Sequence, residues 1–365
     1  MKQSVRYLRT SDEVSLAWAE AGKGMPLVKA ANWLTHLEYD WESPVWRHWT
    51  RFFAGHFRYI RHDERGCGMT DWNVGDLSFP RWVDDLERVI DAAGIARPFA
   101  LLGISQGAAT VIAYAVRHPQ RVSHLILYGG YAVGAHKRGD AEYIRGYQAV
   151  TELIRQGWNS RNPVFRQLFT SRFIPEGNDE QIGWFNDLCR KTTTPEIGAT
   201  LMAARGDVDA RELLARVRTP TLVLHADRDQ VVPPSEGKRL AGEIPGASFV
   251  RLDSRNHVLL EHEPAWLQFQ KAVLEFTGQS APAALRESDQ LQSLTARERD
   301  ILPLLCEGLS NAQIAWKLGI SEKTARNHLS HLYEKLGVHS RAGAIAFAYE
   351  QQLHRQPQRP SCRPP

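Results

Sequence analysis

Hydrophobic and polar positions along the first 130 residues alternate between two periods. Short apolar runs typical of β-strands are separated by segments with apolar residues at helical spacing, which predicts βαβ units around a parallel sheet. We expect strands over Val5–Thr10, Val14–Glu20, Pro26–Ala31, Phe57–His62, Pro98–Ile104 and Val122–Tyr128, and helices over Val45–Ala54, Pro80–Ala93 and Ala108–Arg117. This part of the chain therefore has the pattern of an α/β fold.

The strand pattern is interrupted over about residues 135–217. That segment has helical spacing, many aromatic residues and no β-type run, so we expect an inserted helical cap. Strands resume over 220–226 and 248–252, and a helix over 265–276 follows. We place this first domain at residues 1–277.

A small helical domain is predicted near the end of the chain. Residues 278–293 are small, polar and proline-containing, which is typical of a linker. Thr295 and Glu298 then have the spacing of a capping box that begins a helix. We place the second domain at 294–353, and we expect a disordered tail at 354–365 because its composition offers nothing to bury.

Two short helices and a glycine-containing turn at Leu318–Ser321 predict a helix-turn-helix. Its last helix has a core face formed by Ala325, Leu329, Leu332 and Leu336. The opposite face is polar and basic, and we expect it to enter the major groove of DNA, where arginine suits guanine and asparagine suits adenine. The candidate base-reading residues are Arg326 and Asn327, with Lys323, Thr324, Ser330 and Lys335 as further DNA-binding candidates.

The run LTARERDILPLLCEGLSNAQIAWKLGISEKTARNHLSHLYEKLGVHSR closely resembles the LuxR-type DNA-binding domain. It departs from that pattern at Ala325, where valine is usual, at Gln313 in place of glutamate, and at Pro303, which would kink a helix interior. The resemblance implies that the chain binds double-stranded DNA as a homodimer, with half-sites near one helical turn apart.

The net charge of the chain is concentrated in the same region. The chain has 45 Lys and Arg against 41 Asp and Glu, a net charge of +4. This excess lies entirely from Leu291 onward, where ten basic residues stand against six acidic ones. Attraction to a polyanion must therefore come from the last fifth of the chain. Because the excess within the helical domain is modest, we expect that dimerisation is needed for affinity.

The pentapeptide Gly103-Ile104-Ser105-Gln106-Gly107 follows an apolar strand and opens a helix. In this context a serine is held on a sharp turn with its hydroxyl exposed. A serine nucleophile needs a histidine to take its proton and an acid to orient that histidine. Asp229 and His257 follow later strands in the required order, with Asp227 as the alternative acid and His124, His225 and His262 as alternative bases.

Four motifs together resemble the α/β-hydrolase family: Asp63-x-Arg65-Gly66-x-Gly68, GISQG, DQVVP and NH-x-LLEHEPAW. The resemblance covers about residues 1–277 and implies acyl transfer by Ser105, Asp229 and His257. It favours Asp229 as the acid because that residue directly precedes the x-V-V-P stretch. It also places oxyanion N–H groups at Gln106 and Trp33, although Trp33 as a pocket wall remains the alternative.

The oxyanion loop is the main departure from the family pattern, because Ala31-Asn32 stands where His-Gly is usual. This departure leaves two functions open. The first is a transcriptional regulator that senses a small ligand in a hydrolase-like domain. The second is an active serine esterase or lactonase with an appended DNA-binding domain.

Aromatic residues of the cap are expected to line an apolar pocket above the serine, for an acyl or aromatic ligand. The candidates are Trp33, Trp158, Phe165, Phe169, Phe173 and Trp184. Packing of the cap onto the sheet is the alternative for each of them.

Cysteine spacing and hydropathy indicate whether the chain has a metal site, a disulfide framework or a membrane span. Cys67, Cys189, Cys306 and Cys362 lie far apart, without a CxxC pair or a metal-spaced cluster. We therefore expect no metal, no cofactor and a reducing compartment. No signal peptide is recognisable and no apolar stretch approaches the ~18–20 residues of a membrane span. The sequence predicts a cytoplasmic protein without a membrane partner.

Overall fold

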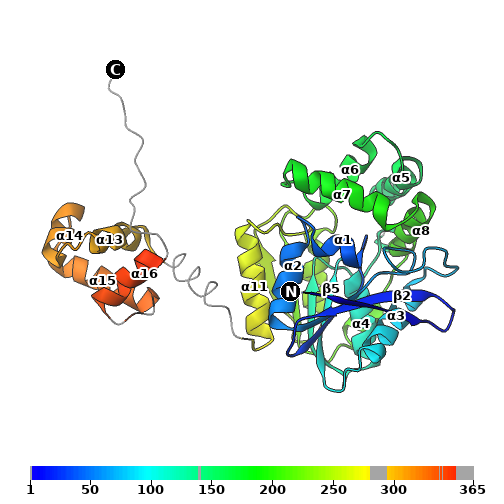
Figure 1. Cartoon of the computed structure of the whole chain (residues 1–365), viewed down its shortest axis with the longest axis horizontal. Coiled ribbons are helices and arrows are strands. Elements are labelled where there is room, and N and C mark those ends of the chain that lie inside the picture. Colours follow the sequence, from blue (N-terminus) through cyan, green and yellow to red (C-terminus); the bar gives the residue numbers. More distant parts are fainter. Residues whose placement is uncertain (1, 139–140, 280–293, 337, 339, 351–365) are drawn as a thin grey trace. The chain divides into compact units, whose positions relative to one another are not determined.

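The computed structural model describes residues 2–138, 141–279, 294–336, 338 and 340–350 (Figure 1). The chain divides into two compact units, residues 1–279 and 280–365. The predicted tail at 354–365 lies outside the described residues, and so does the predicted linker apart from residues 278 and 279.

The first unit is built on an eight-stranded sheet with the order β1-β2-β4-β3-β5-β6-β7-β8. β1 and β2 pair antiparallel, as do β2 and β4, whereas all other pairs are parallel. The strands are β1 (Ser4–Arg9), β2 (Ser15–Ala21), β3 (Pro26–Lys29), β4 (Arg58–His62), β5 (Phe99–Ile104), β6 (Val122–Tyr128), β7 (Thr221–Ala226) and β8 (Ser248–Leu252). Each lies within two residues of its predicted range, so the α/β fold class is confirmed.

Helices cover both faces of this sheet. They are α1 (Leu37–Trp41), α2 (Arg47–His56), α3 (Phe79–Ala92), α4 (Gly107–Arg117), α10 (Pro234–Glu243) and α11 (Pro264–Phe276). Figure 1 shows α2 and α11 on one side of the sheet and α3 and α4 on the other. An aromatic cluster joins the first pair, because the Trp49 ring lies 4.7 Å from those of Trp266 and Phe269. α1 and α10 are helices that the sequence pattern does not predict.

The cap lies between β6 and β7 in the chain. It consists of η1 (Ala135–Lys137), α5 (Ala141–Gly157), α6 (Val164–Phe173), α7 (Asp179–Thr192), α8 (Pro195–Gly206) and α9 (Arg211–Leu214). Figure 1 shows α5 to α8 as a helical layer of their own beside the sheet domain. The inserted segment is therefore helical, as its aromatic-rich pattern predicts.

The parallel strands bring distant segments to one edge of the sheet. Ile104 at the end of β5 pairs with Tyr128 at the end of β6, and Ala226 at the end of β7 pairs with Leu252 at the end of β8. Residues that follow these strands emerge at the same edge. In open parallel sheets, ligand sites form at this carboxyl edge.

The second unit contains α13 (Ala296–Cys306), α14 (Asn311–Leu318), α15 (Glu322–Leu336) and α16 (Arg341–Glu350). Its core includes Ile301, Leu305, Ile314, Leu329 and Leu332, all nearly inaccessible to solvent. The predicted capping box begins α13, which continues through Pro303 without a break. This small core supports the helix-turn-helix.

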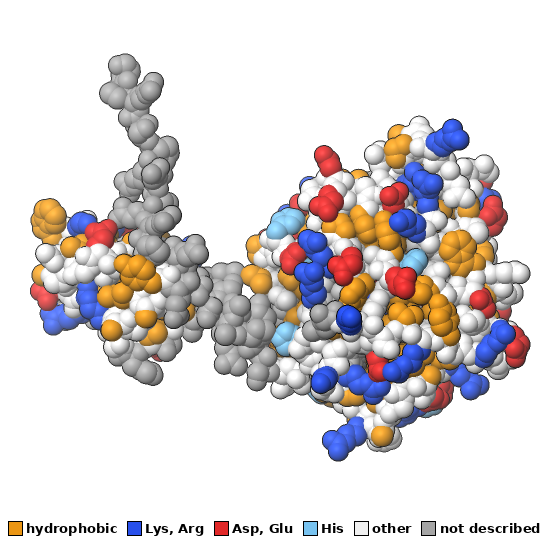
Figure 2. Space-filling view, viewed as in Figure 1, with side chains coloured by type: hydrophobic (Ala, Val, Ile, Leu, Met, Phe, Trp, Pro, Cys, Tyr) orange, Lys and Arg blue, Asp and Glu red, His pale blue; other side chains and the backbone are white. Residues whose placement is uncertain are grey.

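Charge is mixed over the surface of the first unit. Figure 2 shows basic and acidic side chains interspersed across the visible face of residues 1–279. That distribution agrees with the near balance of charges in this part of the sequence, where 34 Lys and Arg stand against 33 Asp and Glu. Within the described part of the chain, no helix has the length and apolar character needed to cross a membrane.

Candidate functional site

Ser105 occupies the turn between β5 and α4 in a left-handed backbone conformation, with φ 54°. Residues with a side chain rarely adopt this conformation, and backbone hydrogen bonds fix it here. The Ser105 N–H donates to Tyr128 O at 3.0 Å, and Ser105 O accepts from the Ala108 N–H at 3.1 Å. Gly103 is required at the start of the turn, because a Cβ there would lie 2.6 Å from Ala108 Cα.

Asp229 and His257 lie together beyond β7 and β8. Asp229 Oδ2 is 2.6 Å from His257 Nδ1, while Asp229 Oδ1 accepts the N–H groups of Val231 and Val232 at 2.7 and 3.0 Å. His257 Nε2 is buried without a hydrogen-bond partner among the described residues. A carboxylate fixed in this way favours a proton on Nδ1 and leaves the lone pair of Nε2 available.

Two glycines after β6 bring this pair next to Ser105. A Cβ on Gly129 would lie 3.2 Å from His257 Cε1, and a Cβ on Gly130 would lie 3.3 Å from Ser105 O. Ser105 and His257 therefore pack against consecutive residues. The three side chains that the sequence singles out converge at the carboxyl edge of the sheet.

The alternative acid and bases lie in other environments. Asp227 forms ion pairs with exposed arginines. His225 Nε2 is 3.0 Å from Val232 O, and burial lowers the pKa of this histidine, so it is held as a neutral donor. His124 lies near the amino end of β6, and His262 is exposed. His225 Nε2 also lies 3.6 Å from Asp229 Oδ2, which is beyond hydrogen-bond distance, whereas His257 Nδ1 lies at 2.6 Å from the same oxygen.

Polar side chains hold the loop after β3, where the α/β-hydrolase pattern has glycine. Asn32 is buried, its Oδ1 accepts from Lys29 Nζ, and its Nδ2 donates to Trp33 O at 3.3 Å. Burial lowers the pKa of Lys29 to about 8. The left-handed residue of this loop is Leu34, with φ 57°. Lys29 and Asn32 thus give the loop a defined conformation without glycine.

The same loop lies against the start of α4. A Cβ on Gly107 would lie 3.0 Å from Ala31 O. Among the hydrogen bonds of the described residues, none uses the backbone N–H of Trp33 or Gln106 as a donor. The two N–H groups that the sequence assigns to an oxyanion therefore belong to adjacent segments.

The motif Asp63-x-Arg65-Gly66-x-Gly68 forms the loop after β4, where its side chains bind neighbouring segments. Asp63 Oδ2 accepts the N–H groups of Leu37 and Met69 at 3.0 and 2.9 Å. Arg65 is buried and donates to Asp85 through two hydrogen bonds of 2.7 Å. Gly68 is required, because a Cβ there would lie 2.4 Å from Asp63 Oδ2. These contacts give the motif a structural role.

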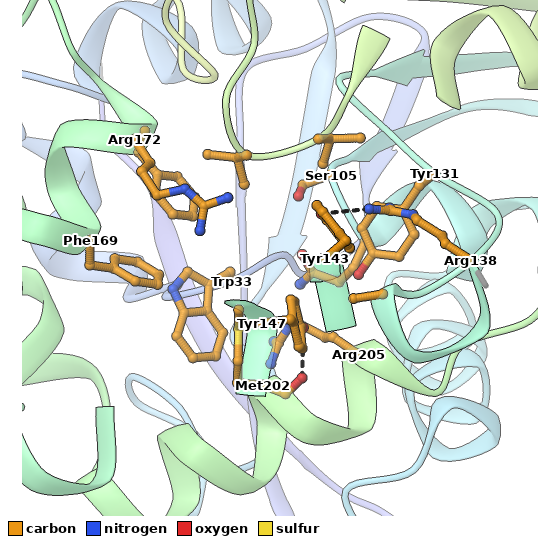
Figure 3. A pocket seen from close by; sticks show the side chains of 15 residues that line it. Trp33, Ser105, Tyr131, Arg138, Tyr143, Tyr147, Phe169, Arg172, Met202 and Arg205 are labelled. Carbon is orange, nitrogen blue, oxygen red and sulfur yellow. Dashed lines mark hydrogen bonds between the residues drawn. The ribbon is translucent and has the colours of Figure 1, made fainter. Parts of the chain in front are cut away.

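A pocket that is partly open to solvent lies between Ser105 and the cap (Figure 3); the space between its lining atoms, including the part open to solvent, is about 560 Å³. Its lining comprises Trp33, Ser105, Gln106, Tyr131, Ala135, Arg138, Tyr143, Tyr147, Phe169, Arg172, Phe173, Met202, Arg205, Val231 and Val232. Three of the six expected aromatic residues are among them: Trp33, Phe169 and Phe173. Half of the predicted aromatic residues thus line the cavity.

The other three expected pocket residues lie elsewhere. Trp158 is buried behind the lining, with its ring 5.9 Å from that of Trp33. Phe165 is 38% exposed and packs on Gly157, and Trp184 stacks on Tyr39 at 4.9 Å. These residues therefore pack the cap and do not line the cavity. Helical spacing could not predict this difference, because it does not determine which face of a cap helix meets the cavity.

The polar part of this lining is not indicated by the sequence pattern. Three tyrosines and three arginines face the cavity: Tyr131, Tyr143, Tyr147, Arg138, Arg172 and Arg205. They come from the loop after β6 and from α5, α6 and α8. Tyr143 and Tyr147 lie one turn apart on α5, and this spacing is the one local pattern that could have indicated a polar cavity wall. No local pattern marks the three arginines as cavity residues.

The candidate DNA-binding side chains lie on α15. Lys323, Thr324, Arg326, Asn327 and Ser330 are all exposed, whereas the predicted core positions are buried. Five of the six predicted residues thus share the accessible side of one helix.

Lys335 differs from this set. Its ammonium donates to Glu298 Oε2 at 2.7 Å, and Glu298 is only 2% exposed. The same carboxylate caps α13 by accepting the Thr295 N–H at 2.7 Å. Lys335 is therefore the partner of a buried carboxylate, with its own side chain 32% exposed, and we expect it to stabilise the fold more than it binds DNA.

Caps define the helix-turn-helix. Ser310 and Gln313 form a capping box at the start of α14, so glutamine in place of the usual glutamate still accepts the Ser310 N–H, at 2.8 Å. Gly319 ends α14 with φ 65°, and Ser321 Oγ accepts the Thr324 N–H at 3.0 Å to begin α15. The departure at Gln313 leaves the motif intact.

Comparison with known proteins identifies the two units independently. Residues 47–264 match the family described as serine aminopeptidase, S33, and residues 292–348 match the family of bacterial regulatory proteins, luxR family. The chain is 26% identical over 253 residues to the AB hydrolase superfamily protein YisY of Bacillus subtilis, covering 69% of this chain and 91% of that protein.

Two further similarities concern a regulator and a solved structure. The chain is 31% identical over 196 residues to the probable transcriptional regulatory protein SgaR of Hyphomicrobium methylovorum, covering 51% of this chain and 88% of that protein. The crystal structure of a hydrolase from Pseudomonas aeruginosa PA01 superposes with a TM-score of 0.62 at 27% identity, covering 75% of this chain and 98% of that one.

Proposed function

Because the chain belongs to the S33 family of α/β hydrolases and carries a LuxR-type helix-turn-helix, we propose that it is a transcriptional regulator whose hydrolase domain senses a small ligand. The observation that carries this proposal is the partly aromatic pocket above Ser105, in one chain with a helix-turn-helix whose last helix exposes a polar and basic side. The name of SgaR, a probable transcriptional regulatory protein, agrees with it. Trp33, Phe169 and Phe173 favour an acyl or aromatic ligand.

The DNA-binding mode follows from the exposed side of α15. Arg326 and Asn327 read bases in the major groove, while Lys323 and Thr324 contact phosphates. The protein binds as a homodimer to half-sites separated by about one helical turn, which is ~34–36 Å. Two copies are needed because the helical unit carries little excess positive charge.

The test measures DNA affinity in the presence of ligands. DNA sites are selected from a random library with the full chain, and their dissociation constants are measured by fluorescence anisotropy with a panel of acyl and aromatic compounds. At least one compound changes the affinity. Met202→Trp, which fills the cavity, removes the response without changing the affinity of the unliganded protein.

The matched control is Leu168→Trp, because Leu168 is exposed on α6 and does not line the cavity. This variant keeps the response. If no compound changes DNA affinity, or if Met202→Trp responds as the wild type does, the sensor function is wrong.

A second candidate function is hydrolysis of an ester or lactone. The contact of 2.6 Å between Asp229 and His257, beside a serine in a left-handed turn, favours it. Ser105 Oγ attacks the carbonyl carbon as its proton passes to His257 Nε2, and the oxyanion is held by the N–H groups of Gln106 and Trp33. The C–O bond then breaks, the leaving alkoxide takes the proton, and water hydrolyses the acyl-serine.

Hydrolysis is tested with chromogenic esters of increasing acyl length, comparing the wild type with Ser105→Ala. An enzyme shows a chain-length optimum, and the variant loses its turnover by ~10³-fold or more. Equal rates for the two proteins exclude catalysis by Ser105 and leave the sensor function alone.

A further inference from the structure

The cavity above Ser105 contains three guanidinium groups with unequal partners. Arg205 is neutralised, because it pairs with the buried carboxylate of Glu64 and lies over the Trp33 ring at 4.4 Å. Burial raises the pKa of Glu64, while Arg205 acts in the opposite direction. This pair forms part of the cavity wall and contributes no uncompensated charge.

Arg138 has a poorer counter-ion. Its Nε donates to Val133 O at 2.9 Å and its Nη1 to the Tyr143 hydroxyl at 2.6 Å. The carboxylate in its vicinity, Glu236, lies 3.9 Å away and also interacts with Arg239 at 3.6 Å. The Arg138 side chain is only 12% exposed, so a largely buried cation shares its counter-charge with another arginine.

Arg172 is in the last turn of α6, is partly exposed, and takes part in no ion pair among the described residues. Its Nη2 donates to Gln230 O at 2.8 Å, which occupies one of five guanidinium N–H donors. Figure 3 shows the guanidinium of Arg172 turned into the cavity from one side and that of Arg138 approaching from the other, with Ser105 between them. The two cations therefore face a common space.

A cavity with aromatic walls and two guanidinium groups that lack a carboxylate of their own binds an organic anion more tightly than a neutral compound of the same shape. Hydrogen bonds between a guanidinium group and a carboxylate are among the strongest in proteins, because both partners are charged and their geometries match. Phe169, Phe173 and Met202 provide apolar contacts for the remainder of the molecule. Inorganic phosphate would leave these surfaces unfilled.

We propose that the ligand of this cavity is a small organic acid, an acyl or aromatic compound whose carboxylate binds Arg172, with Arg138 as the second cation. This assignment rests on the proposed function, because it names the ligand class of the same cavity. It goes beyond that function by requiring a negative charge on the ligand.

The test compares acids with amides of the same shape. The probes are ω-phenylalkanoates from phenylacetate to 5-phenylpentanoate and their primary amides, titrated calorimetrically into the full chain carrying Ser105→Ala, so that no amide is hydrolysed. At least one acid binds about tenfold or more tightly than its amide. Inorganic phosphate, titrated in parallel, does not bind.

Two substitutions of Arg172 test whether this residue binds the carboxylate of the ligand. Arg172→Gln reduces the preference for the acid to about threefold or less, because it removes one charged hydrogen bond. Arg172→Lys keeps the charge but loses the planar fork, and gives an intermediate preference. The matched control is Arg190→Gln, an exposed arginine of α7 that does not line the cavity and leaves the preference unchanged. Retained DNA binding and unchanged circular dichroism show that each variant is folded.

Three results overturn the assignment: acids and amides bind equally, no acid binds, or Arg172→Gln keeps the wild-type preference. These outcomes are separable from failure of the sensor function. If amides bind as well as acids and still change DNA affinity, the sensor function stands and the charge requirement is wrong. If acids bind preferentially but DNA affinity does not respond, the charge requirement stands and the sensor function is wrong.

Discussion

Ser105, Asp229 and His257 are each less than a tenth exposed, whereas Lys323, Arg326 and Asn327 are exposed on α15. The first three come from segments far apart in the chain and meet at the carboxyl edge of the sheet. The last three lie within two turns of one helix. The candidate catalytic residues are therefore buried and distant in the sequence, whereas the candidate DNA-binding residues are exposed and close together in the sequence.

The contrast follows from the partners that each chemistry requires. A buried acid–base pair must be desolvated and oriented, so it needs a large scaffold with fixed hydrogen bonds. A surface that binds DNA must stay hydrated and accessible, so a small core that keeps α15 in place is sufficient. The first unit should consequently be sensitive to the loss of buried charge partners, and the second to the loss of exposed side chains and helix caps.

The largest expected effect comes from breaking a buried ion pair in the first unit. Arg65→Met leaves Asp85 as an uncompensated buried carboxylate, and we expect it to lower the free energy of unfolding by ~3–5 kcal/mol. Chemical denaturation followed by tryptophan fluorescence measures this, because ten of the 11 tryptophans lie in residues 1–279.

Arg155→Met is the matched control, because Arg155 pairs with Glu152 on the surface with both side chains about half exposed. It should change stability by no more than ~0.5 kcal/mol. A cost below ~1 kcal/mol for Arg65→Met would show that the charge network does not set the stability of the first unit.

Acid should destabilise the first unit through buried histidines. Burial lowers the pKa of His48 to about 4 and that of His62 to about 3. As pH falls below ~6.5, the unfolded chain binds protons that the folded chain does not, so stability is lost by up to ~1.4 kcal/mol per pH unit for each histidine. The loss attributable to His48 ends near pH 4.

The measurement is the difference in pH dependence between the wild type and His48→Gln, which retains an N–H donor for Leu259 O. The variant should lose stability less steeply between pH 6.5 and 4. The two proteins are compared with each other because Asp40 affects both of them. Burial raises the pKa of Asp40 to about 7, so rising pH destabilises each protein over the same range. Parallel curves for the two proteins would show that His48 is protonated in the folded state.

In the second unit, substitution of a base-reading residue should weaken DNA binding without affecting stability. Arg326→Ala should cost ~1–3 kcal/mol in affinity for the selected site and relax the preference at one base pair. Lys335→Met should leave DNA affinity nearly unchanged and lower the stability of the second unit, because Lys335 neutralises Glu298. Binding titrations at several salt concentrations test both variants. Unchanged sequence preference and salt dependence for Arg326→Ala would contradict the assignment of α15.

The smallest expected effect is the loss of a helix cap. Thr295 Oγ1 accepts the Glu298 N–H at 3.3 Å, and Thr295→Ala should lower the free energy of unfolding of the second unit by ~1 kcal/mol. Thr295→Ser keeps the hydroxyl and should retain most of the wild-type free energy of unfolding. Thermal unfolding followed by circular dichroism measures the difference. Equal stability of the two variants would show that the hydroxyl does not stabilise α13.

Local sequence patterns determined the eight strands, the cap as a helical insertion and the core face of α15. Strand and helix periods are set by which side of an element is buried, so they can be identified within a single segment. α10 was missed because Pro234 and Gly237 resemble a loop. The structure shows that a Cβ on Gly237 would lie 2.4 Å from His225 Nδ1, so this glycine permits close packing of α10 on β7.

Only the tertiary structure decided what surrounds each candidate residue. Helical spacing could not tell Phe169, which lines the cavity, from Phe165, which does not. It also gave no indication that Lys335 pairs with Glu298. Arg138, Arg172 and Arg205 come from separate segments, so no local pattern predicts that they share a cavity. The physical reason is that hydrophobic periodicity reports burial of a face, whereas the identity of the facing partner depends on contacts between residues distant in the chain.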